Sequence, residues 1–390
     1  MVRLIWRTGE WRKMSIYELA RTPRITAGIG ARARIAALAG GGPVLLVADP
    51  GLKSTGLVEE IAGGLRGHGL ALTIFDAFQS DPTIAQADAA AELARSEKAT
   101  AVVCLGGGSA LDLGKAVAAI ALAQQSAAHY QLFANPLPAK GLRKICVPTT
   151  AGTGSETTRT AILTRDDHAK VWLWGDEIKA DEVVLDPELT VSLPGPLTAA
   201  TGIDALVHAV EAATNRNANP AAGLYAHEAI RLVARHLVAA VETPGNLDAR
   251  AGLQWAAAFA GVAIDNCGTA IAHALGHAMG SLRPIHHGRA VGIAMLASLP
   301  WNIENNEAFA ACAVDMGAAP SAHGFVAAYE KLLRASGVKL SLAEEFAGVS
   351  AEELAAQTAR PENAAMRDSN RREASEADLL TLAKQVLSVS

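Results

Sequence analysis

Short apolar runs alternate with segments of helical spacing through the first half of the chain. The apolar runs predict β-strands at residues 24–28, 43–48, 71–75, 100–105, 144–147, 160–164 and 182–185. Between them, segments with apolar residues on one helical face predict helices at residues 31–38, 57–68, 83–97 and 110–123. This alternation of strands and helices predicts an open α/β sheet.

The pattern changes after the Pro194-Gly195-Pro196 segment. From there to Ser390 the apolar spacing is mostly helical and β-branched runs are almost absent, which predicts an all-α second domain. We therefore expect an α/β domain at residues 14–195 and an all-α domain at residues 196–390. Residues 1–13 are basic and lack the apolar stretch of a secretory signal, so we interpret them as an N-terminal extension or a misplaced start.

Histidines concentrate in one apolar segment of the second half. His273, His277 and His287 lie within fifteen residues, although the chain has only 11 histidines. His273 and His277 are four apart, so a helix presents them on one face. Converging imidazoles indicate a metal site, because neutral imidazole binds first-row metals well; hydrogen-bonded core or surface histidines are the alternative interpretation. Ala274 replaces the general-base glutamate of the zinc-protease H-E-x-x-H motif, which excludes that class.

A second apolar segment, TGIDALVHAVEAA at residues 201–213, supplies further candidate ligands. Asp204 and His208 are also four apart, and a buried carboxylate is normally paired or bound to a metal. Together with His273 and His287 they give one carboxylate and three imidazoles. This mixture of oxygen and nitrogen ligands suits Fe(II) or Zn(II), and it leaves positions free for water or substrate.

Three glycines follow the apolar run at residues 100–105, and a predicted helix follows them. A strand, a glycine turn and a helix N-terminus in succession form a phosphate-binding pattern, since free N–H groups and the helix dipole attract an anion. The residues are Gly106, Gly107, Gly108 and Ser109. Ser109 and Asp112 also fit a capping box, which explains part of the pattern without a ligand.

Other segments of the first half also suit a nucleotide. The PTTAGTGSETT loop at residues 148–158 is rich in hydroxyl groups and could line a pyrophosphate or serve only as a polar connection. Asp49 ends the run at 43–48, where a carboxylate accepts hydrogen bonds from a ribose and repels a 2′-phosphate; a simple Asp-Pro-Gly turn is the alternative. Gly28-x-Gly30-x-x-Ala33 matches the Rossmann fingerprint in letters only, and a glycine turn opening a helix is the alternative.

Composition narrows the class of protein. The net charge of −5 and the pI near 6.1 argue against nucleic-acid binding, because no basic stripe is present. No stretch reaches the roughly 18 uncharged apolar residues of a membrane helix. The isolated cysteines Cys104, Cys146, Cys267 and Cys312 fit packing residues in a reducing compartment. We therefore expect a cytoplasmic protein with no nucleic-acid or membrane partner.

Six segments together resemble the iron-containing (group III) alcohol dehydrogenases, in order and spacing as well as in letters, and the resemblance covers about Thr22 to Leu387. The segments are GGGSALDLGK (106–115), PTTAGTGSE (148–156), DPELTVSLP (186–194), GIDALVHAVEA (202–212), HALGHAMGSLRPIHHG (273–288) and PENAAMRDSNRR (361–372). The resemblance implies a dehydroquinate synthase-like fold, with an α/β dinucleotide-binding domain and an all-α metal-binding domain. It also implies oxidation of alcohols, or reduction of aldehydes, with NAD(P).

The resemblance assigns residues as well. It implies that the metal, Fe(II) with Zn(II) as the second candidate, binds Asp204, His208, His273 and His287, and that His277 sits beside the metal and relays a proton. It places NAD against Asp49, Gly106, Gly107, Gly108, Ser109, Asp112, Thr149, Thr150, Thr153 and Lys170, and it makes the Gly28-x-Gly30 turn irrelevant to phosphate. Asp49 then favours NAD over NADP, and the expected assembly is a homodimer.

The resemblance leaves several points open. His286-His287-Gly288 stands where many members have Pro-His-Gly, so His286 is an alternative ligand. Thr160, Ile264 and Met366 align with the substrate pocket and leave the alcohol undefined. A Zn-dependent polyol dehydrogenase, a dehydroquinate-synthase-like lyase and a maleylacetate-type reductase are alternatives within the fold. A metal-dependent hydrolase is an alternative outside the fold, but it gives the glycine and threonine loops no role. An inert metal-binding scaffold is another, and it predicts no NAD binding.

Overall fold

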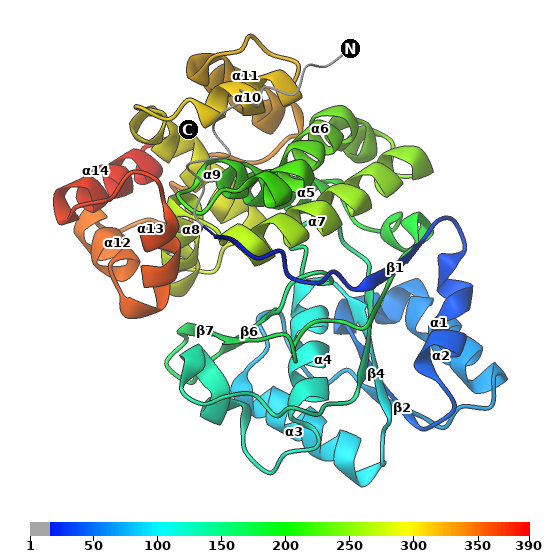
Figure 1. The fold of residues 1–390 in the computed structure, drawn as a ribbon. Helices are drawn as coiled ribbons and strands as arrows, with labels where there is room; N and C mark the ends of the chain where they lie inside the picture. Colours follow the sequence, from blue (N-terminus) through cyan, green and yellow to red (C-terminus); the bar gives the residue numbers. More distant parts are fainter. Residues whose placement is uncertain (1–15) are drawn as a thin grey trace.

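The computed structural model describes residues 16–390, and the expected extension at residues 1–13 lies outside them. The chain forms an α/β half and a helical half, stacked one on the other (Figure 1). The α/β half takes the chain from β1 to β8, and the helical half begins with α5, Gly195–Thr214. The predicted fold class, a parallel-sheet α/β domain followed by a mostly helical domain, is confirmed.

The sheet has six parallel strands in the order β1-β8-β5-β4-β2-β3. Its strands are β1 (Arg24–Ala27), β2 (Val44–Ala48), β3 (Leu72–Phe75), β4 (Ala101–Gly106), β5 (Arg143–Pro148) and β8 (Glu182–Leu185). The central strands are apolar throughout because both faces are covered, as is usual for parallel sheets. Leu45 and Val47 face one core, while Val44 and Leu46 face the other.

Helices cover both faces of this sheet. α1 (Ile35–Ala39) and α2 (Leu57–Gly67) pack on one face, and α3 (Ile84–Ser96) and α4 (Gly108–Ile120) pack on the other. Short 3-10 helices complete this half: η2 (Ala31–Arg34), η3 (Pro50–Thr55), η4 (Ala127–Phe133) and η5 (Pro187–Thr190). The predicted helices are thus present, although 31–38 is divided between η2 and α1 and α4 begins two residues early.

The run at residues 160–164 is a strand, but it does not join the main sheet as expected. β6 (Thr160–Thr164) pairs antiparallel with β7 (Lys170–Trp174) as a separate hairpin. β7 was not predicted, because its residues alternate between buried and accessible positions and do not form one apolar run. Ala161, Leu163, Val171 and Leu173 point into the core beside α4, so the other face of the hairpin remains open toward the helical half.

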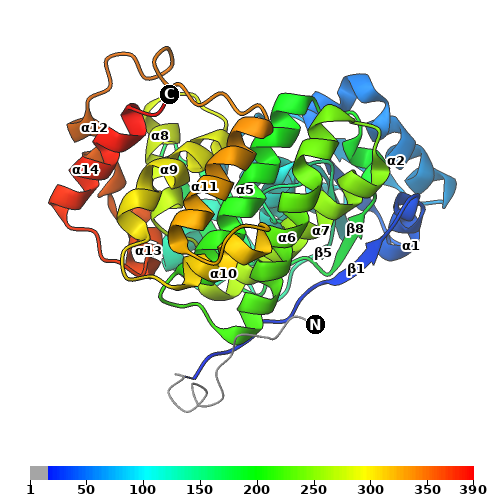
Figure 2. The same cartoon turned by 90° about the horizontal axis from the view of Figure 1, so that it is seen from above.

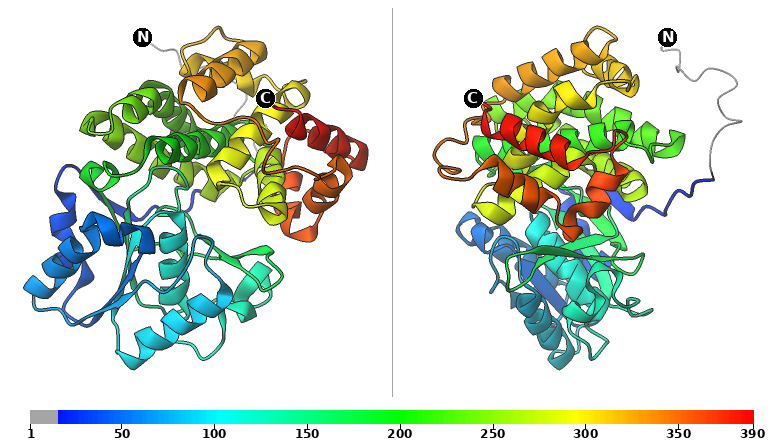
Figure 3. Two further views of the ribbon diagram at one scale, coloured as in Figure 1. Left: turned by 180° about the vertical axis from the view of Figure 1, so that it is seen from behind. Right: turned by 90° about the vertical axis from the view of Figure 1, so that its left-hand side faces the viewer.

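The helical half surrounds α5, most of whose side chains are buried. Figure 2 shows α5 between α6 and α9, and Figure 3 shows the α12–α14 group at one end of this half. The remaining elements are α6 (Pro220–Glu242), α7 (Leu247–Cys267), α8 (Ile271–Leu282), α9 (His287–Asn302), α10 (Ala308–Asp315), α11 (Ala322–Ala335), α12 (Ala351–Thr358), η6 (Pro361–Asn363), α13 (Ala364–Ser369) and α14 (Glu376–Leu387).

Within residues 16–390 no single helix combines the length and apolarity needed to cross a membrane. The pair α7 and α8 meets both requirements only when taken together, and it is bent by 103°.

Buried polar contacts hold the two halves together. The Lys179 ammonium lies 2.7 Å from the Asp265 carboxylate of α7, and each side chain is only 1% exposed. Gly154, in the threonine-rich loop, has φ +64°, and a Cβ there would lie 2.6 Å from Cα of Gly261 in α7. Such close backbone approach requires glycine. The loop is therefore fixed against the helix that faces it.

Candidate active site

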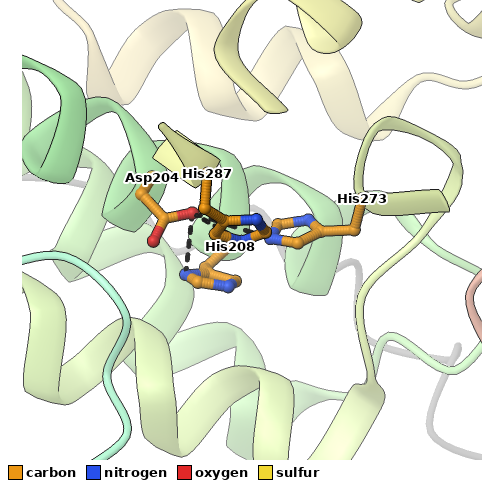
Figure 4. Close-up of side chains that lie close together, drawn as sticks. All are labelled: Asp204, His208, His273 and His287. Carbon is orange, nitrogen blue, oxygen red and sulfur yellow. Dashed lines mark ion pairs between the residues drawn. The ribbon is translucent and has the colours of Figure 1, made fainter. Parts of the chain in front are cut away.

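Four of the predicted ligands meet between three helices of the helical half. Asp204 and His208 come from α5, His273 from α8, and His287 from the first residue of α9 (Figure 4). One ligand atom from each lies within 4.8 Å of all the others. Oδ1 of Asp204 is 3.9 Å from Nδ1 of His208, 3.7 Å from Nε2 of His273 and 3.5 Å from Nε2 of His287.

Glycines allow the helices to approach this closely. A Cβ at Gly288 would overlap the Ala200 carbonyl oxygen and lie 3.1 Å from Cβ of Asp204. A Cβ at Gly292 would lie 2.6 Å from the side chain of Ile203. These absent side chains let α9 pack directly on α5, which places His287 against Asp204.

Unpartnered ligand atoms show that the site fits a metal ion. Oδ1 of Asp204, Nδ1 of His208 and Nε2 of His273 are buried and have no hydrogen-bond partner. An unsatisfied buried polar atom is costly, and three that point at one another call for a shared partner. One oxygen and three nitrogens match the ligand preferences of Fe(II) and Zn(II). A divalent ion would satisfy all of these atoms at once.

The charge states of three of the four residues also suit a metal. Burial opposes ionisation of Asp204, but the surrounding imidazoles outweigh it and hold the pKa of that carboxyl well below its usual range. Burial lowers the pKa of His208 to about 4 and that of His287 to about 3. Both rings are therefore neutral near pH 7 and keep a lone pair for a metal.

Glu211, which was not among the predicted site residues, forms a hydrogen bond with His273. Its carboxylate is buried and lies 2.6 Å from Nδ1 of His273. It also accepts hydrogen bonds from the N–H groups of Ala270 and Ala272, at 2.7 and 2.8 Å, where α8 begins. Burial alone would lower the pKa of His273, but Glu211 and Asp204 outweigh it and raise that pKa to about 9.

The spacing of Glu211 from the ligands of α5 could have identified it from the sequence. Asp204, His208 and Glu211 stand at positions i, i+4 and i+7 of α5, so they share one face. A carboxylate that accepts the Nδ1 proton of a ligand histidine fixes its orientation and leaves Nε2 free for the metal.

His277 and His286 lie beside this cluster but outside it. The His277 ring centroid is 5.2 Å from that of His287 and 6.3 Å from that of His273. Burial lowers the pKa of His277 well below its usual range. His286 precedes α9 and lines the same cavity, but its ring nitrogens are not among the converging ligand atoms. His287, and not the alternative ligand His286, therefore joins Asp204, His208 and His273 in the cluster.

A cavity of about 800 Å³ extends from this cluster to the α/β half. The dinucleotide candidates that line it are Asp49, Gly107, Gly108, Ser109, Asp112, Thr149, Thr150, Thr153 and Lys170. The substrate-pocket candidates Thr160, Ile264 and Met366 line it too. In contrast, Gly28 and Gly30 form a turn after the edge strand β1 and are not among the lining residues.

Close packing against Asp49 and Thr153 requires glycine in the turn at residues 106–108. Gly106 has φ +148°, and a Cβ there would lie 2.6 Å from Cβ of Asp49. A Cβ at Gly108 would lie 2.6 Å from the Thr153 methyl group. Without side chains the turn packs against both residues while its N–H groups remain at the start of α4, where an anion is favoured.

The predicted capping box at the start of α4 is wrong. Gly107 is the N-cap, and no side chain caps this helix. The Asp112 carboxylate instead accepts hydrogen bonds from Ser155 Oγ at 2.5 Å and from the N–H of Ile162 at 3.1 Å. Ser109 Oγ accepts one from the N–H of Asp81 at 3.1 Å. Both side chains therefore contact neighbouring segments, which are two loops and the strand β6, instead of the N-terminus of their own helix.

Lys115, also absent from our predictions, organises the threonine-rich loop. Its ammonium is fully buried and donates to the carbonyl oxygens of Ser155 and Thr160, at 2.7 and 2.5 Å. It also lies 3.3 Å from Asp112. A single lysine thus joins α4, the loop and β6. Lys170, by contrast, extends into the cavity and pairs with Asp81 at 2.8 Å.

Two family models match the chain. That of the iron-containing alcohol dehydrogenases matches residues 22–187, and that of the C-terminal part of the Fe-containing alcohol dehydrogenase family matches residues 198–387.

Comparisons with individual proteins also point to alcohol and aldehyde oxidoreductases. The chain is 39% identical over 249 residues to long-chain-alcohol dehydrogenase 1 of Geobacillus thermodenitrificans, a match that spans 63% of each protein. It is 34% identical over 291 residues to the NAD-dependent methanol dehydrogenase of Bacillus methanolicus, covering 74% of this chain and 76% of that one. The sulfoacetaldehyde reductase of Bifidobacterium kashiwanohense, solved in complex with NAD+, superposes with a TM-score of 0.88 at 28% identity, covering 96% of this chain and 100% of that one.

Proposed function

The chain belongs to the iron-containing alcohol dehydrogenase family, and on that premise we propose that it transfers hydride between NAD(H) and a small primary alcohol or its aldehyde. One observation carries the proposal: the unpartnered metal-ligand atoms open into the same cavity as the glycine turn. In this proposal the α/β domain of residues 14–195 binds the dinucleotide and residues 196–390 hold the metal.

The metal would be held by Asp204, His208, His273 and His287. When bound there, an Fe(II) or Zn(II) ion supplies Lewis-acid polarisation of the substrate oxygen. Iron is our first candidate because of the family, and zinc is the second because its affinity for such ligands is at least as high. Glu211 keeps the Nδ1 proton of His273 on the far side of its ring, so that Nε2 faces Asp204.

The dinucleotide would lie across the α/β side of the cavity, and its nicotinamide supplies the hydride acceptor. The N–H groups of Gly107, Gly108 and Ser109 stand at the N-terminus of α4 and would bind the pyrophosphate. The hydroxyl groups of Thr149, Thr150 and Thr153 line the same space. Asp49 would bind the ribose hydroxyl groups and repel a 2′-phosphate, so we propose NAD rather than NADP.

His277 is our candidate for the residue that accepts and releases the proton of the alcohol. It lies half-buried in the cavity wall next to His287, and desolvation lowers its pKa well below the usual range, so that the ring is neutral near pH 7. A neutral imidazole can accept the proton that the alcohol hydroxyl loses and release it toward solvent. Lys170, which lines the cavity and pairs with Asp81, is our candidate for positioning the nicotinamide ribose.

The charged side chains that line the cavity argue against a maleylacetate-type reductase. Lys170 is the one lysine or arginine among its described lining residues, and Asp81 neutralises it. A maleylacetate-type substrate carries two carboxylates, which need cationic partners. A polyol dehydrogenase or a lyase of this fold typically uses one carboxylate and two histidines, whereas a third histidine, His208, completes this cluster.

Location and assembly are further proposals. Cys104, Cys146, Cys267 and Cys312 are all free and buried, which agrees with a reducing cytoplasm. Ile16 is fully exposed, and Tyr17 and Leu19 are 41% and 47% exposed. Apolar side chains exposed together fit an intermolecular contact, so we propose a homodimer.

The decisive experiment uses full-length protein stripped of metal and reloaded with Fe(II) or Zn(II). NADH oxidation is followed spectrophotometrically with a panel of small aldehydes. We expect activity that depends on the added metal and exceeds that with NADPH. Absence of turnover with every metal and aldehyde, despite NADH binding, would overturn the proposal and favour the lyase.

A further inference from the structure

Three aromatic side chains gather beside the cavity, and the proposed function gives them no role. Phe133, at the end of η4, packs edge-on against Trp172 and Trp174 of β7, with ring centroids 4.6 and 5.3 Å apart. All three line the cavity, and Phe133 is 62% exposed. We refer to Phe133, Trp172 and Trp174 as the aromatic cluster. Large apolar rings left partly open to a cavity indicate a binding surface.

The pairing of the hairpin fixes where these rings point. Val171 and Leu173 are buried in the core, so the alternation of a strand turns Lys170, Trp172 and Trp174 to the opposite face. Ile162 of β6 pairs with Trp172 and faces the same way. The cavity side of the hairpin is therefore an apolar strip that begins beside Lys170.

The backbone at the end of η4 directs Phe133 toward this strip. Leu132 and Phe133 have φ values of 52° and 63°. Two consecutive non-glycine residues in the left-handed region are costly and persist only where the surroundings hold them. Leu132 packs toward the core while Phe133 turns outward onto the two tryptophans. The exposed ring is thus positioned by the fold.

Across the cavity, the helical half presents apolar side chains as well. Ile264 of α7, Ile285 before α9 and Met366 of α13 line the same space. Figure 1 shows the hairpin below α8 and α13, on the side of the sheet away from α1 and α2. The aromatic cluster therefore lies apart from the strand ends of β2 and β4, where the dinucleotide is proposed to bind.

The aromatic cluster lines the same cavity as the metal ligands. Lys170, which also lines this cavity, is two residues before Trp172 in β7. Two residues of a strand span about 6.6 Å. A substrate whose oxygen is at the metal ligands must extend past its first few carbon atoms to reach Trp172.

Resting on the proposed function, we propose that the aromatic cluster is a specificity subsite for the uncharged apolar tail of the alcohol, with Trp172 as its main contact. The tail would lie between Trp172 and the Ile264–Met366 wall. Long-chain and ring-bearing primary alcohols would therefore be preferred to ethanol and to 1,3-propanediol. Anionic substrates would be disfavoured, because Lys170, the one lysine or arginine lining the cavity within residues 16–390, is paired with Asp81.

The test compares a series of straight-chain primary alcohols, from ethanol to 1-octanol, and benzyl alcohol. Burial of each methylene group is worth about fourfold in kcat/KM, so the wild type should gain steeply once the chain reaches Trp172. In Trp172→Ala the ratio of 1-hexanol to ethanol should fall at least about tenfold, with ethanol nearly unchanged. Phe133→Ala should lower the same ratio by less, and its exposed position makes a folding defect improbable.

Trp255→Ala is the matched control. Trp255 packs against Phe259 in α7, with ring centroids 5.2 Å apart, and does not line the cavity. Its removal should leave the ratio unchanged. Binding of 1-hexanol and ethanol to the metal-loaded protein, measured by calorimetry, provides a readout without turnover. Trp172→Ala should weaken only the binding of 1-hexanol.

Each outcome separates the two proposals. Turnover of ethanol with no gain for longer alcohols, or an unchanged ratio in Trp172→Ala, overturns the subsite and leaves the proposed function intact. No turnover of any alcohol, combined with 1-hexanol binding that depends on Trp172, overturns the proposed function and supports the subsite. Neither turnover nor Trp172-dependent binding overturns both.

Discussion

The carboxylate of Glu211 lies 2.6 Å from Nδ1 of His273, and both side chains are buried. The same carboxylate accepts hydrogen bonds from three backbone N–H groups at the start of α8. Glu211 therefore fixes both the helix that carries His273 and the orientation of its ring. This arrangement makes Glu211 a positioning residue for the candidate metal site.

Glu211→Gln should weaken metal binding by roughly 10- to 100-fold, the usual cost of losing a partner of a metal-binding histidine. Glutamine keeps the shape of the side chain but cannot accept all the hydrogen bonds that the carboxylate accepts. Competition between the protein and a chelator for Fe(II) or Zn(II) measures the change. Glu228→Gln, on the exposed face of α6, is the control, and equal affinities of the two variants would contradict the assignment.

His277→Ala and His208→Ala should fail in different ways. Loss of a general acid–base group typically lowers turnover by roughly 10²- to 10⁴-fold, so His277→Ala should lose activity but retain its metal. His208→Ala removes one of the four converging ligands and should lose the metal itself. Metal analysis of the purified variants, together with steady-state kinetics, distinguishes them. Full activity in His277→Ala, or stoichiometric metal in His208→Ala, would refute the corresponding role.

Asp49→Asn should shift the preference toward NADP(H). Removing the negative charge abolishes repulsion of a 2′-phosphate, worth about 1 kcal/mol or more at a distance of about 4 Å. The NADPH-to-NADH ratio of kcat/KM should rise about tenfold. Asparagine keeps the oxygen that accepts the N–H of Gly51, so η3 should remain intact. Asp76→Asn, near the end of β3 and paired with Lys53, should leave the ratio unchanged.

Glu156 should make the stability of the protein depend on pH. Burial raises the pKa of Glu156 from 4.5 to about 7. Between these values the folded state binds a proton that the unfolded state has lost, so stability decreases as pH rises. At about 1.4 kcal/mol per pKa unit, the loss approaches about 3 kcal/mol.

Glu156→Gln removes this titration, because the amide is neutral at every pH. Thermal unfolding of the metal-free proteins should show the variant more stable than wild type at pH 8 and nearly equal at pH 5. A difference that does not change with pH would show that Glu156 does not titrate in this range.

The sequence was sufficient for features that depend on local spacing. Asp204 and His208 share a face because a helix repeats every 3.6 residues, and the glycine turn follows its strand directly in the chain. The division into a sheet half and a helical half also follows from the change in apolar period. Glu211 was within reach of the same argument, but its partner His273 is 62 residues away, and spacing alone does not reveal that pairing.

Other residues acquired their roles only through packing. The start of α4 at Gly108 turned Ser109 and Asp112 away from the expected capping box and toward Asp81 and Ser155. The hairpin of β6 and β7 is separate from the main sheet, and only one of its faces is buried in the core. That geometry, rather than any motif, brings Trp172 to the cavity.

The sequence by itself determined the family, the two-part fold and the set of candidate ligands, because these depend on motifs and on the period of apolar residues. The tertiary structure decided which atoms converge. His287 rather than His286 lies against Asp204 because Gly288 lets α9 pack on α5. The distance between two helices depends on which glycines meet at their contact, such as Gly288, and the order of residues alone does not reveal that contact.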